Sequence, residues 1–256
     1  MKHTFLSLCL AAAAALSSIV RAGSLDEVAA RNAALPDYAA LHKLVNDTKK
    51  PMLWLFEGDS ITHGSHHTKG FRSYAEHWQE IVKWEVYWKE DKEQRCNDII
   101  VNAAVSGTTA TDCLANADWR LKQFRPQVVF FNFGVNDVRQ IGDLKRYRAD
   151  LTSLVNMARR KGAIPVLMVP SLCLNPHPRC GEYERVVREI ADKEKILLID
   201  HGGYWREVAN QGDSAPRTWM SNGLHPNELG HRVMAQTMAK ELGIEPKPSV
   251  VLGLPH

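Results

Sequence analysis

The chain has 256 residues, of which 45% are hydrophobic and 24% charged, and this is the composition of a globular protein. Its 16 Gly and 12 Pro follow no regular repeat, which excludes a collagen-like or wholly disordered chain. The formal charge of +3, without a long run of Lys or Arg, excludes strong polyanion binding. At about 100–200 residues per domain, the length allows one large domain or two small ones.

The N-terminus has the pattern of a secretory signal peptide. Lys2 and His3 precede an uncharged apolar run, residues 5–20, and Val20-Arg21-Ala22 resembles a cleavage site between small residues. The alternative is an uncleaved anchor helix, but the run is short for a membrane span. We therefore expect residues 1–22 to be removed, leaving residues 23–256 without a membrane span in the periplasm or outside the cell.

Export changes the interpretation of the cysteines, because disulfides persist in oxidising compartments. Removal of Cys9 leaves an even number of cysteines, and proximity in the sequence favours the pairs Cys96–Cys113 and Cys173–Cys180. Buried thiols are the alternative. A metal site is disfavoured because no two cysteines are separated by only two to four residues.

Short apolar runs alternate with longer segments of helical periodicity. The runs are nearly continuous in apolar residues, as in strands that are buried on both faces. Helical spacing is clearest over residues 144–161, and an amphipathic stretch covers residues 25–46. This alternation predicts a single α/β domain whose parallel sheet lies between helices. The predicted strands are residues 52–56, 98–105, 128–133, 164–169 and 196–199.

In open α/β sheets the reacting groups collect at the carboxyl ends of the strands, and polar motifs follow the predicted strands here. The first is Gly58-Asp59-Ser60, where a serine at a strand-to-helix turn exposes its hydroxyl and a nearby backbone N–H. A simple helix N-cap is the alternative. Gly107 follows the second strand and allows close approach of the backbone to a ligand, although an ordinary turn also favours glycine.

Two further motifs complete the set. After the third strand, Asn136 can turn its amide toward the same crevice, and Asp137 can hold the loop; a plain turn favours the same residue types. Before the C-terminal helix lies His225-Pro226-Asn227. A neutral histidine in a crevice can take a proton from a serine hydroxyl, while Asn227 suits the N-cap of the helix.

Together these motifs resemble the SGNH (GDSL-type) hydrolase superfamily in their order, spacing and strand context. The resemblance implies a three-layer α/β/α fold with a five-stranded, mainly parallel, flavodoxin-like sheet, and an ester hydrolase that needs no metal or organic cofactor. It implies Ser60 as nucleophile and His225 as general base, with Asp59 and Asp137 supporting the site. The expected oxyanion hole consists of the backbone N–H groups of Ser60 and Gly107 and the side chain of Asn136.

One position departs from the family pattern. The usual partner of the histidine is an aspartate three residues before it, and this chain has Asn222. In a serine protease the change from Asp to Asn costs about 10⁴ in turnover, but Asn serves in Cys-His-Asn enzymes. We expect an active enzyme with Asn222 as the histidine's partner, unless Asp200, Asp213 or another acid lies nearby. The alternative is a catalytically impaired glycan-binding protein.

The substrate class follows from export and from features that the sequence lacks. No apolar lid or membrane-binding segment is visible, which favours O-acyl groups, especially O-acetyl groups, on carbohydrate. An acyl-lipid esterase or thioesterase is the alternative, and no nucleic-acid partner is expected. His63, His66 and His67 follow the serine motif, and we expect a surface loop near the mouth of the cleft there rather than a metal site, because no carboxylate or cysteine has ligand spacing beside them.

Overall fold

The computed structural model describes residues 23–86 and 95–245. The predicted signal peptide lies outside these residues, so the cleavage site stays a prediction. In the described part of the chain, no helix has both the length and the apolar character needed to cross a membrane.

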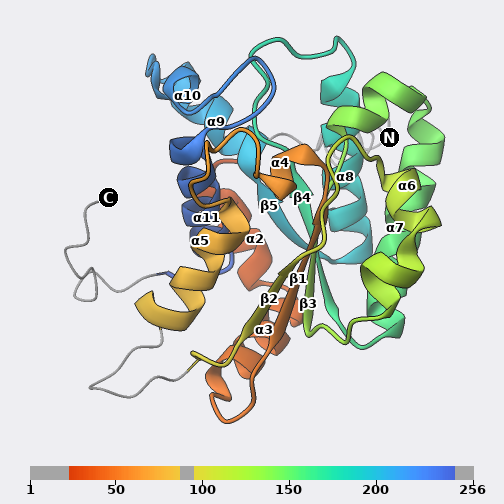
Figure 1. The fold of residues 1–256 in the computed structure, drawn as a ribbon, viewed down its shortest axis with the longest axis vertical. Helices are drawn as coiled ribbons and strands as arrows, with labels where there is room; N and C mark the ends of the chain where they lie inside the picture. Colours follow the sequence, from red (N-terminus) through yellow and green to blue (C-terminus); the bar gives the residue numbers. More distant parts are fainter. Residues whose placement is uncertain (1–22, 87–94, 246–256) are drawn as a thin grey trace, which may run out of the picture.

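Five parallel strands form one sheet in the order β2-β1-β3-β4-β5 (Figure 1). Strands β3, β4 and β5 are buried along their whole length, which explains their continuous Val, Ile, Leu and Phe content. The predicted α/β fold and its five strands are confirmed. The strands are β1 (Leu53–Gly58), β2 (Ile99–Asn102), β3 (Val128–Asn132), β4 (Ile164–Val169) and β5 (Leu197–Asp200).

Strand β2 is shorter than the predicted run of residues 98–105. It lies at the edge of the sheet, and after Asn102 the chain enters the loop that leads to Gly107. The Asn102 side chain leaves the strand to donate a hydrogen bond to the carbonyl oxygen of Thr62 at 2.9 Å. The apolar run therefore continues past the strand into a loop beside β1.

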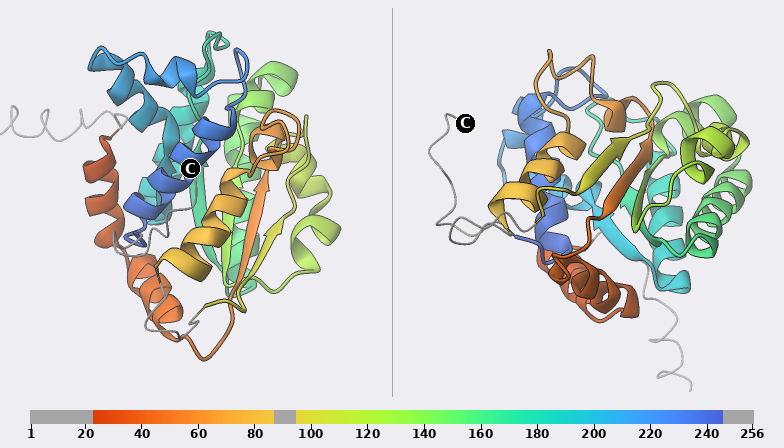
Figure 2. Two further views of the ribbon diagram at one scale, coloured as in Figure 1. Left: turned by 60° about the vertical axis from the view of Figure 1, so that its left-hand side comes forward. Right: turned by 60° about the horizontal axis from the view of Figure 1, so that its bottom comes forward.

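Helices cover both faces of the sheet (Figures 1 and 2). Helices α3, α5 and α11 enclose one buried apolar cluster, and α6, α7 and α8 enclose the other. The predicted amphipathic stretch is two helices, because Pro36 starts a new helix at a position that suits proline. The helices are α2 (Leu25–Ala33), α3 (Pro36–Asn46), α4 (Ser60–His63), α5 (Tyr74–Glu80), α6 (Ala110–Ala115), α7 (Leu144–Arg160), α8 (Cys180–Glu194), α9 (His201–Asn210), α10 (Ala215–Thr218) and α11 (Glu228–Glu241), with π-helical turns η1 (Ile81–Glu85), η2 (Asp118–Lys122) and η3 (Asp137–Ile141).

The predicted disulfides are wrong for the described residues, where no bond joins Cys96 to Cys113 or Cys173 to Cys180. Cys96 precedes strand β2 and Cys113 lies in α6 beyond its far end, so neighbours in sequence are separated by the strand. Cys113 is a buried thiol, and its Sγ donates to Glu57 Oε2 at 3.6 Å. Cys173 and Cys180 are thiols that line the same pocket.

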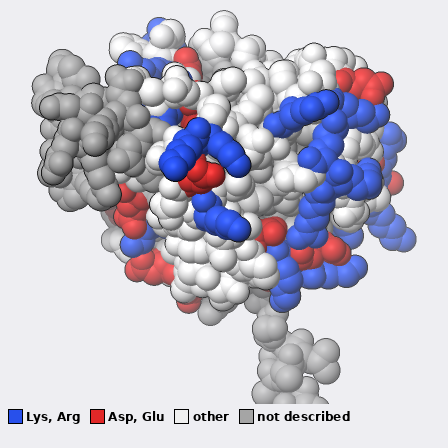
Figure 3. Space-filling view, turned by 90° about the horizontal axis from the view of Figure 1, so that it is seen from below, with Lys and Arg blue, Asp and Glu red and all other residues white. Residues whose placement is uncertain are grey.

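Charged side chains are unevenly distributed over the end of the molecule where the strands begin. Figure 3 views this end, and Lys and Arg gather on one side of it. Helix α7 ends here with Arg159 and Arg160 in its last turn, where cations are favoured by the helix dipole. The polar motifs noted above lie at the opposite end, where the parallel strands finish.

Candidate active site

The turn after β1 carries Gly58, Asp59 and Ser60. A Cβ on Gly58 would lie 2.1 Å from Thr62 Oγ1 and 2.9 Å from the carbonyl oxygen of Asn132, so only glycine fits. Asp59 caps the short helix α4 by accepting a hydrogen bond from the Ile61 N–H at 2.9 Å. Ser60 is the first residue of this helix and stays half-buried at the strand end.

The loop before α11 carries His225. The Ser221 N–H donates to the carbonyl oxygen of His225 at 2.8 Å, and Met220 pairs with Pro226 in a bridge. Asn227 caps α11, as predicted from its residue type, by accepting from two backbone N–H groups of the first turn. These contacts bring His225 Nε2 to 2.8 Å from Ser60 Oγ, across 165 positions of sequence.

Asn222 lies on the other side of the imidazole. Its Oδ1 is 3.2 Å from His225 Nδ1 and accepts the backbone N–H groups of Leu224 at 2.8 Å and His225 at 2.9 Å. An oxygen here favours the tautomer with hydrogen on Nδ1, which leaves the Nε2 lone pair for the Ser60 hydroxyl. Ser60, His225 and Asn222 therefore form one hydrogen-bonded chain.

The two acids considered as alternative partners lie elsewhere. Asp200 is buried at the end of β5, where it pairs with Arg188 at 2.6 Å and caps α9. Asp213 is exposed and accepts from the Ala215 N–H at 2.8 Å. Neither carboxylate contacts His225, so Asn222 is the side chain that hydrogen-bonds to Nδ1.

The loops after β2 and β3 meet beside the serine turn. Asn136 Nδ2 donates to the carbonyl oxygen of Thr108 at 3.1 Å and to Asp59 Oδ2 at 3.4 Å. Gly107 has a φ of +80°, a region that favours glycine, and its carbonyl oxygen accepts from Gln140 Nε2 at 2.8 Å. Asp137 joins both loops by accepting from the N–H groups of Ala110 and Gly134, each at 2.9 Å.

An ion pair that the sequence did not indicate lies beneath these loops. Glu57 in β1 and Arg120 in η2 are both buried, with 2.8 Å between Glu57 Oε2 and an Arg120 terminal nitrogen. Arg120 also donates to the Gly58 carbonyl oxygen at 3.0 Å and to Thr108 Oγ1 at 3.1 Å. The one feature of the sequence that could have pointed to it is Glu57, a charged residue at the end of an otherwise apolar strand, since a buried charge requires a partner.

Burial controls the protonation of the acids around the site. It raises the pKa of Glu57 to about 7, against the opposing effect of Arg120, and it raises the pKa of Asp59 to about 7. Burial also raises the pKa of Asp137 to about 6, against the backbone N–H groups that bind its carboxylate. The carboxyls below the serine turn thus titrate far above the usual range for acids.

The imidazole of His225 is held in its neutral form. Burial lowers the pKa of His225 to about 4, with the neighbouring His67 and Arg139 acting in the same direction. At neutral pH the ring therefore carries no charge and can accept a proton.

His67 lies in the site itself, whereas the three histidines after the serine motif were expected in a surface loop near the mouth of the cleft. Its ring stacks on the His225 ring with centroids 3.6 Å apart and planes inclined by 8°. His67 Nδ1 also faces Asn222 Nδ2 at 3.4 Å. His63 and His66 are exposed, and no group of three His, Cys, Asp or Glu in the described ranges could hold a metal ion.

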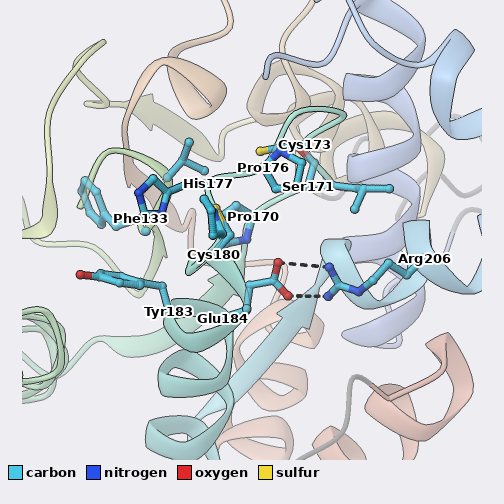
Figure 4. A pocket seen from close by; sticks show the side chains of 15 residues that line it. Phe133, Pro170, Ser171, Cys173, Pro176, His177, Cys180, Tyr183, Glu184 and Arg206 are labelled. Carbon is cyan, nitrogen blue, oxygen red and sulfur yellow. Dashed lines mark hydrogen bonds and ion pairs between the residues drawn. The ribbon is translucent and has the colours of Figure 1, made fainter. Parts of the chain in front are cut away.

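A pocket of about 270 Å³ lies beside the ends of β3 and β4 (Figure 4). Its lining is mainly apolar, and the Glu184–Arg206 ion pair, with one contact of 3.1 Å, lies at one side. The neighbouring amides of Leu174 and Asn175 donate to the carbonyl oxygen of Gly223, so the pocket wall is joined to the His225 loop. The lining residues are Phe133, Gly134, Val135, Pro170, Ser171, Leu172, Cys173, Pro176, His177, Pro178, Cys180, Gly181, Tyr183, Glu184 and Arg206.

Comparison with known proteins adds to this geometry. Residues 56–233 match the GDSL-like lipase/acylhydrolase family. The chain is 28% identical over 207 residues to an acetylxylan esterase of Geobacillus stearothermophilus, covering 75% of this chain and 94% of that protein. It is 27% identical over 144 residues to thioesterase 1/protease 1/lysophospholipase L1 of Escherichia coli K12, covering 56% of this chain and 66% of that one.

A solved structure of an acetylxylan esterase from G. stearothermophilus superposes with a TM-score of 0.63 at 26% identity, covering 76% of this chain and 95% of that one. Catalytic mutants of that enzyme have been solved at a serine, an aspartate and a histidine. Its aspartate precedes its histidine by three positions, the separation of Asn222 from His225 here.

Proposed function

The chain belongs to the GDSL-like lipase/acylhydrolase family and is a carboxylic ester hydrolase; on this premise we propose that it is an exported serine esterase acting on O-acetyl groups of carbohydrate. The observation that carries the proposal is the hydrogen-bonded chain from Ser60 through His225 to Asn222. Acyl transfer to a serine hydroxyl requires an adjacent base with an oriented second nitrogen, and this chain of contacts supplies both.

In the first step of the proposed reaction, His225 Nε2 takes the proton of the Ser60 hydroxyl as Oγ attacks the ester carbonyl. The 2.8 Å contact and the neutral imidazole support this role. Asn222 Oδ1 holds the Nδ1 hydrogen, so the imidazolium that forms is oriented but has no formal negative partner. We expect turnover to be lower than with a carboxylate in this position.

The negative charge that develops on the ester oxygen needs donors. The backbone N–H groups of Ser60 and Gly107 and the Asn136 amide are proposed for this role, in which each donor contributes about 10²–10³ in turnover. The long 3.4 Å contact from Asn136 Nδ2 to Asp59 is the weaker of its two bonds and the one that an oxyanion would replace.

The second half of the reaction returns the enzyme to its starting state. His225 gives its proton to the leaving alcohol oxygen, and a water molecule then attacks the acyl-Ser60 ester with His225 again as base. The acid is released and the serine hydroxyl is restored. The proposed sequence uses only side chains, backbone N–H groups and water.

Different observations support two classes of substrate, which differ in the length of the acyl group. Similarity to an acetylxylan esterase along nearly that protein's whole length supports acetyl esters of carbohydrate. The mainly apolar 270 Å³ pocket beside the site, together with similarity to a thioesterase, supports a second candidate, a longer acyl ester or thioester.

A panel of aryl esters from acetyl to octanoyl, with acetylated xylo-oligosaccharides, separates the two. We expect the highest kcat/KM with acetyl and release of acetate from the oligosaccharide, both absent in Ser60→Ala. A strong preference for octanoyl would replace the acetyl-carbohydrate proposal with the longer acyl class.

Export remains part of the proposal and rests on the sequence of residues 1–22. It predicts that protein recovered from outside the cytoplasm begins at Gly23. The mass of the exported chain tests this, and a chain that retains residues 1–22 in the soluble extracytoplasmic fraction would contradict it.

The acidic limb of the pH profile should reflect His225. Only the neutral imidazole can take the serine proton, so kcat/KM should fall as the pH drops through the His225 pKa of about 4, and not near 6.5. Steady-state rates between pH 3.5 and 8 on an aryl acetate measure this. In Asn222→Asp the opposite charge favours the imidazolium, so the limb should move to higher pH. A wild-type limb above pH 6, unmoved by Asn222→Asp, would contradict the assignment of His225 as base.

A further inference from the structure

The amide at position 222 creates an orientation problem that a carboxylate does not have. Asn222 presents an oxygen on one side and an NH₂ group on the other, and only the oxygen can accept the His225 Nδ1 hydrogen. If the amide were rotated by half a turn, its NH₂ group would face the Nδ1 hydrogen of His225, and two donors would meet without an acceptor. The backbone N–H groups of Leu224 and His225 donate to the Asn222 oxygen and so hold it on the side that faces His225.

His67 acts on the other side of the same amide. Its Nδ1 lies 3.4 Å from Asn222 Nδ2, in position to accept a weak hydrogen bond from the NH₂ group. A flipped amide would turn its oxygen toward the Nδ1 lone pair, so the contact disfavours the wrong orientation. Burial lowers the pKa of His67, with His66 acting in the same direction, which keeps the lone pair free to accept.

The same residue fixes the plane of the base. The His67 ring lies parallel on the His225 ring at 3.6 Å and covers one of its faces. His67 belongs to the loop between α4 and α5, where its neighbour Thr68 is buried and donates its N–H to the Gly64 carbonyl oxygen at 3.4 Å. The stacking ring is thus carried by an anchored segment.

We propose that His67 is a positioning residue for His225, which it orients directly by ring stacking and indirectly by holding the Asn222 amide with its oxygen toward Nδ1. The proposal rests on the proposed serine esterase function. Together His67 and Asn222 take over the orienting part of the role that a carboxylate has in the family pattern.

Two substitutions separate the acceptor from the ring. His67→Phe keeps a flat ring but removes the acceptor, and it should lower kcat for an aryl acetate about tenfold with little change in KM. His67→Asn places an oxygen near the position of Nδ1 but removes the stacking ring, so it should regain only part of that loss. The matched control is His66→Ala, an exposed histidine in the same loop, which should keep kcat within about twofold of wild type.

The decisive comparison repeats His67→Phe in the Asn222→Asp background. A carboxylate presents an oxygen to Nδ1 whichever way it turns, so the loss in kcat should shrink to about twofold or less. Equal losses in the two backgrounds, or no loss in either, would overturn the proposal. Thermal unfolding of each variant establishes that it is folded. Failure of the esterase function itself is recognised separately, because wild type would then hydrolyse no better than Ser60→Ala.

Discussion

Ser60→Ala is expected to lower kcat for an aryl acetate by about 10⁶, while the protein keeps its thermal unfolding midpoint. Ser60 Oγ is the hydroxyl that lies 2.8 Å from His225 Nε2, and alanine leaves no nucleophile in its place. The hydrogen-bond donors proposed for the oxyanion would still bind the ester, so the variant should hydrolyse it faster than water alone does. Steady-state hydrolysis with product detected optically measures the loss.

The matched control for this substitution is Ser65→Ala. Ser65 is exposed in the following loop, and its hydroxyl lies 3.5 Å from His63 Nδ1, so its removal should leave kcat unchanged. Activity of Ser60→Ala within about tenfold of wild type would show that another group performs the reaction, since removal of the nucleophile lowers kcat by several orders of magnitude.

Arg120→Leu is expected to lower the free energy of unfolding by about 3–5 kcal/mol, because it leaves Glu57 buried without its partner. Glu57 is fully buried and within 2.9 Å of Arg120 Nε. Arg120 also holds the Gly58 carbonyl oxygen and Thr108 Oγ1, so esterase activity should fall with stability. Urea denaturation at pH 8 measures the change.

The size of this loss should depend on pH. Burial already holds the pKa of Glu57 at about 7, above its ordinary value, and removal of Arg120 would raise it further. The folded variant therefore binds a proton that the unfolded chain releases above its ordinary pKa of 4.5. Wild-type Glu57 releases its proton near pH 7 and the variant at higher pH, so the variant should lose stability relative to wild type above about pH 7, and the loss should be smaller at pH 4 than at pH 8.

Two control variants test whether the unpaired Glu57 charge causes the loss of stability in Arg120→Leu. Arg120→Leu combined with Glu57→Leu removes both charges and should recover much of the stability. Lys122→Ala breaks an exposed ion pair with Asp118, of 2.6 Å, and should cost less than about 1 kcal/mol. A double variant no more stable than Arg120→Leu would show that the loss comes from packing and not from an unpaired buried charge.

The sequence predicted the sheet because burial on both faces produces a local and continuous pattern. Runs such as residues 128–133 and 164–169 differ from the observed strands β3 and β4 by no more than one residue. Ser60 and Asn136 were expected to lie near one another, because each follows a strand and parallel strands end at one edge of the sheet. His225 was expected from its place before the C-terminal helix, and the structure places its Nε2 2.8 Å from Ser60 Oγ.

Features that depend on three-dimensional proximity were missed. His67 and His225 are far apart in the sequence, and nothing local in the loop indicates that one ring covers the other. The Glu57–Arg120 pair spans 63 positions for the same reason. The predicted Cys96–Cys113 pair used distance along the chain, whereas strand β2 separates these two residues in space.

The most direct test of the account is covalent labelling of Ser60. An alkyl fluorophosphonate reacts with a serine hydroxyl that an adjacent base has activated. Peptide mass spectrometry should find one adduct per chain, on Ser60, formed in step with the loss of esterase activity and absent in His225→Ala. Full inactivation with the adduct on another residue, or full activity with Ser60 labelled, would contradict the assignment of Ser60 as the nucleophile.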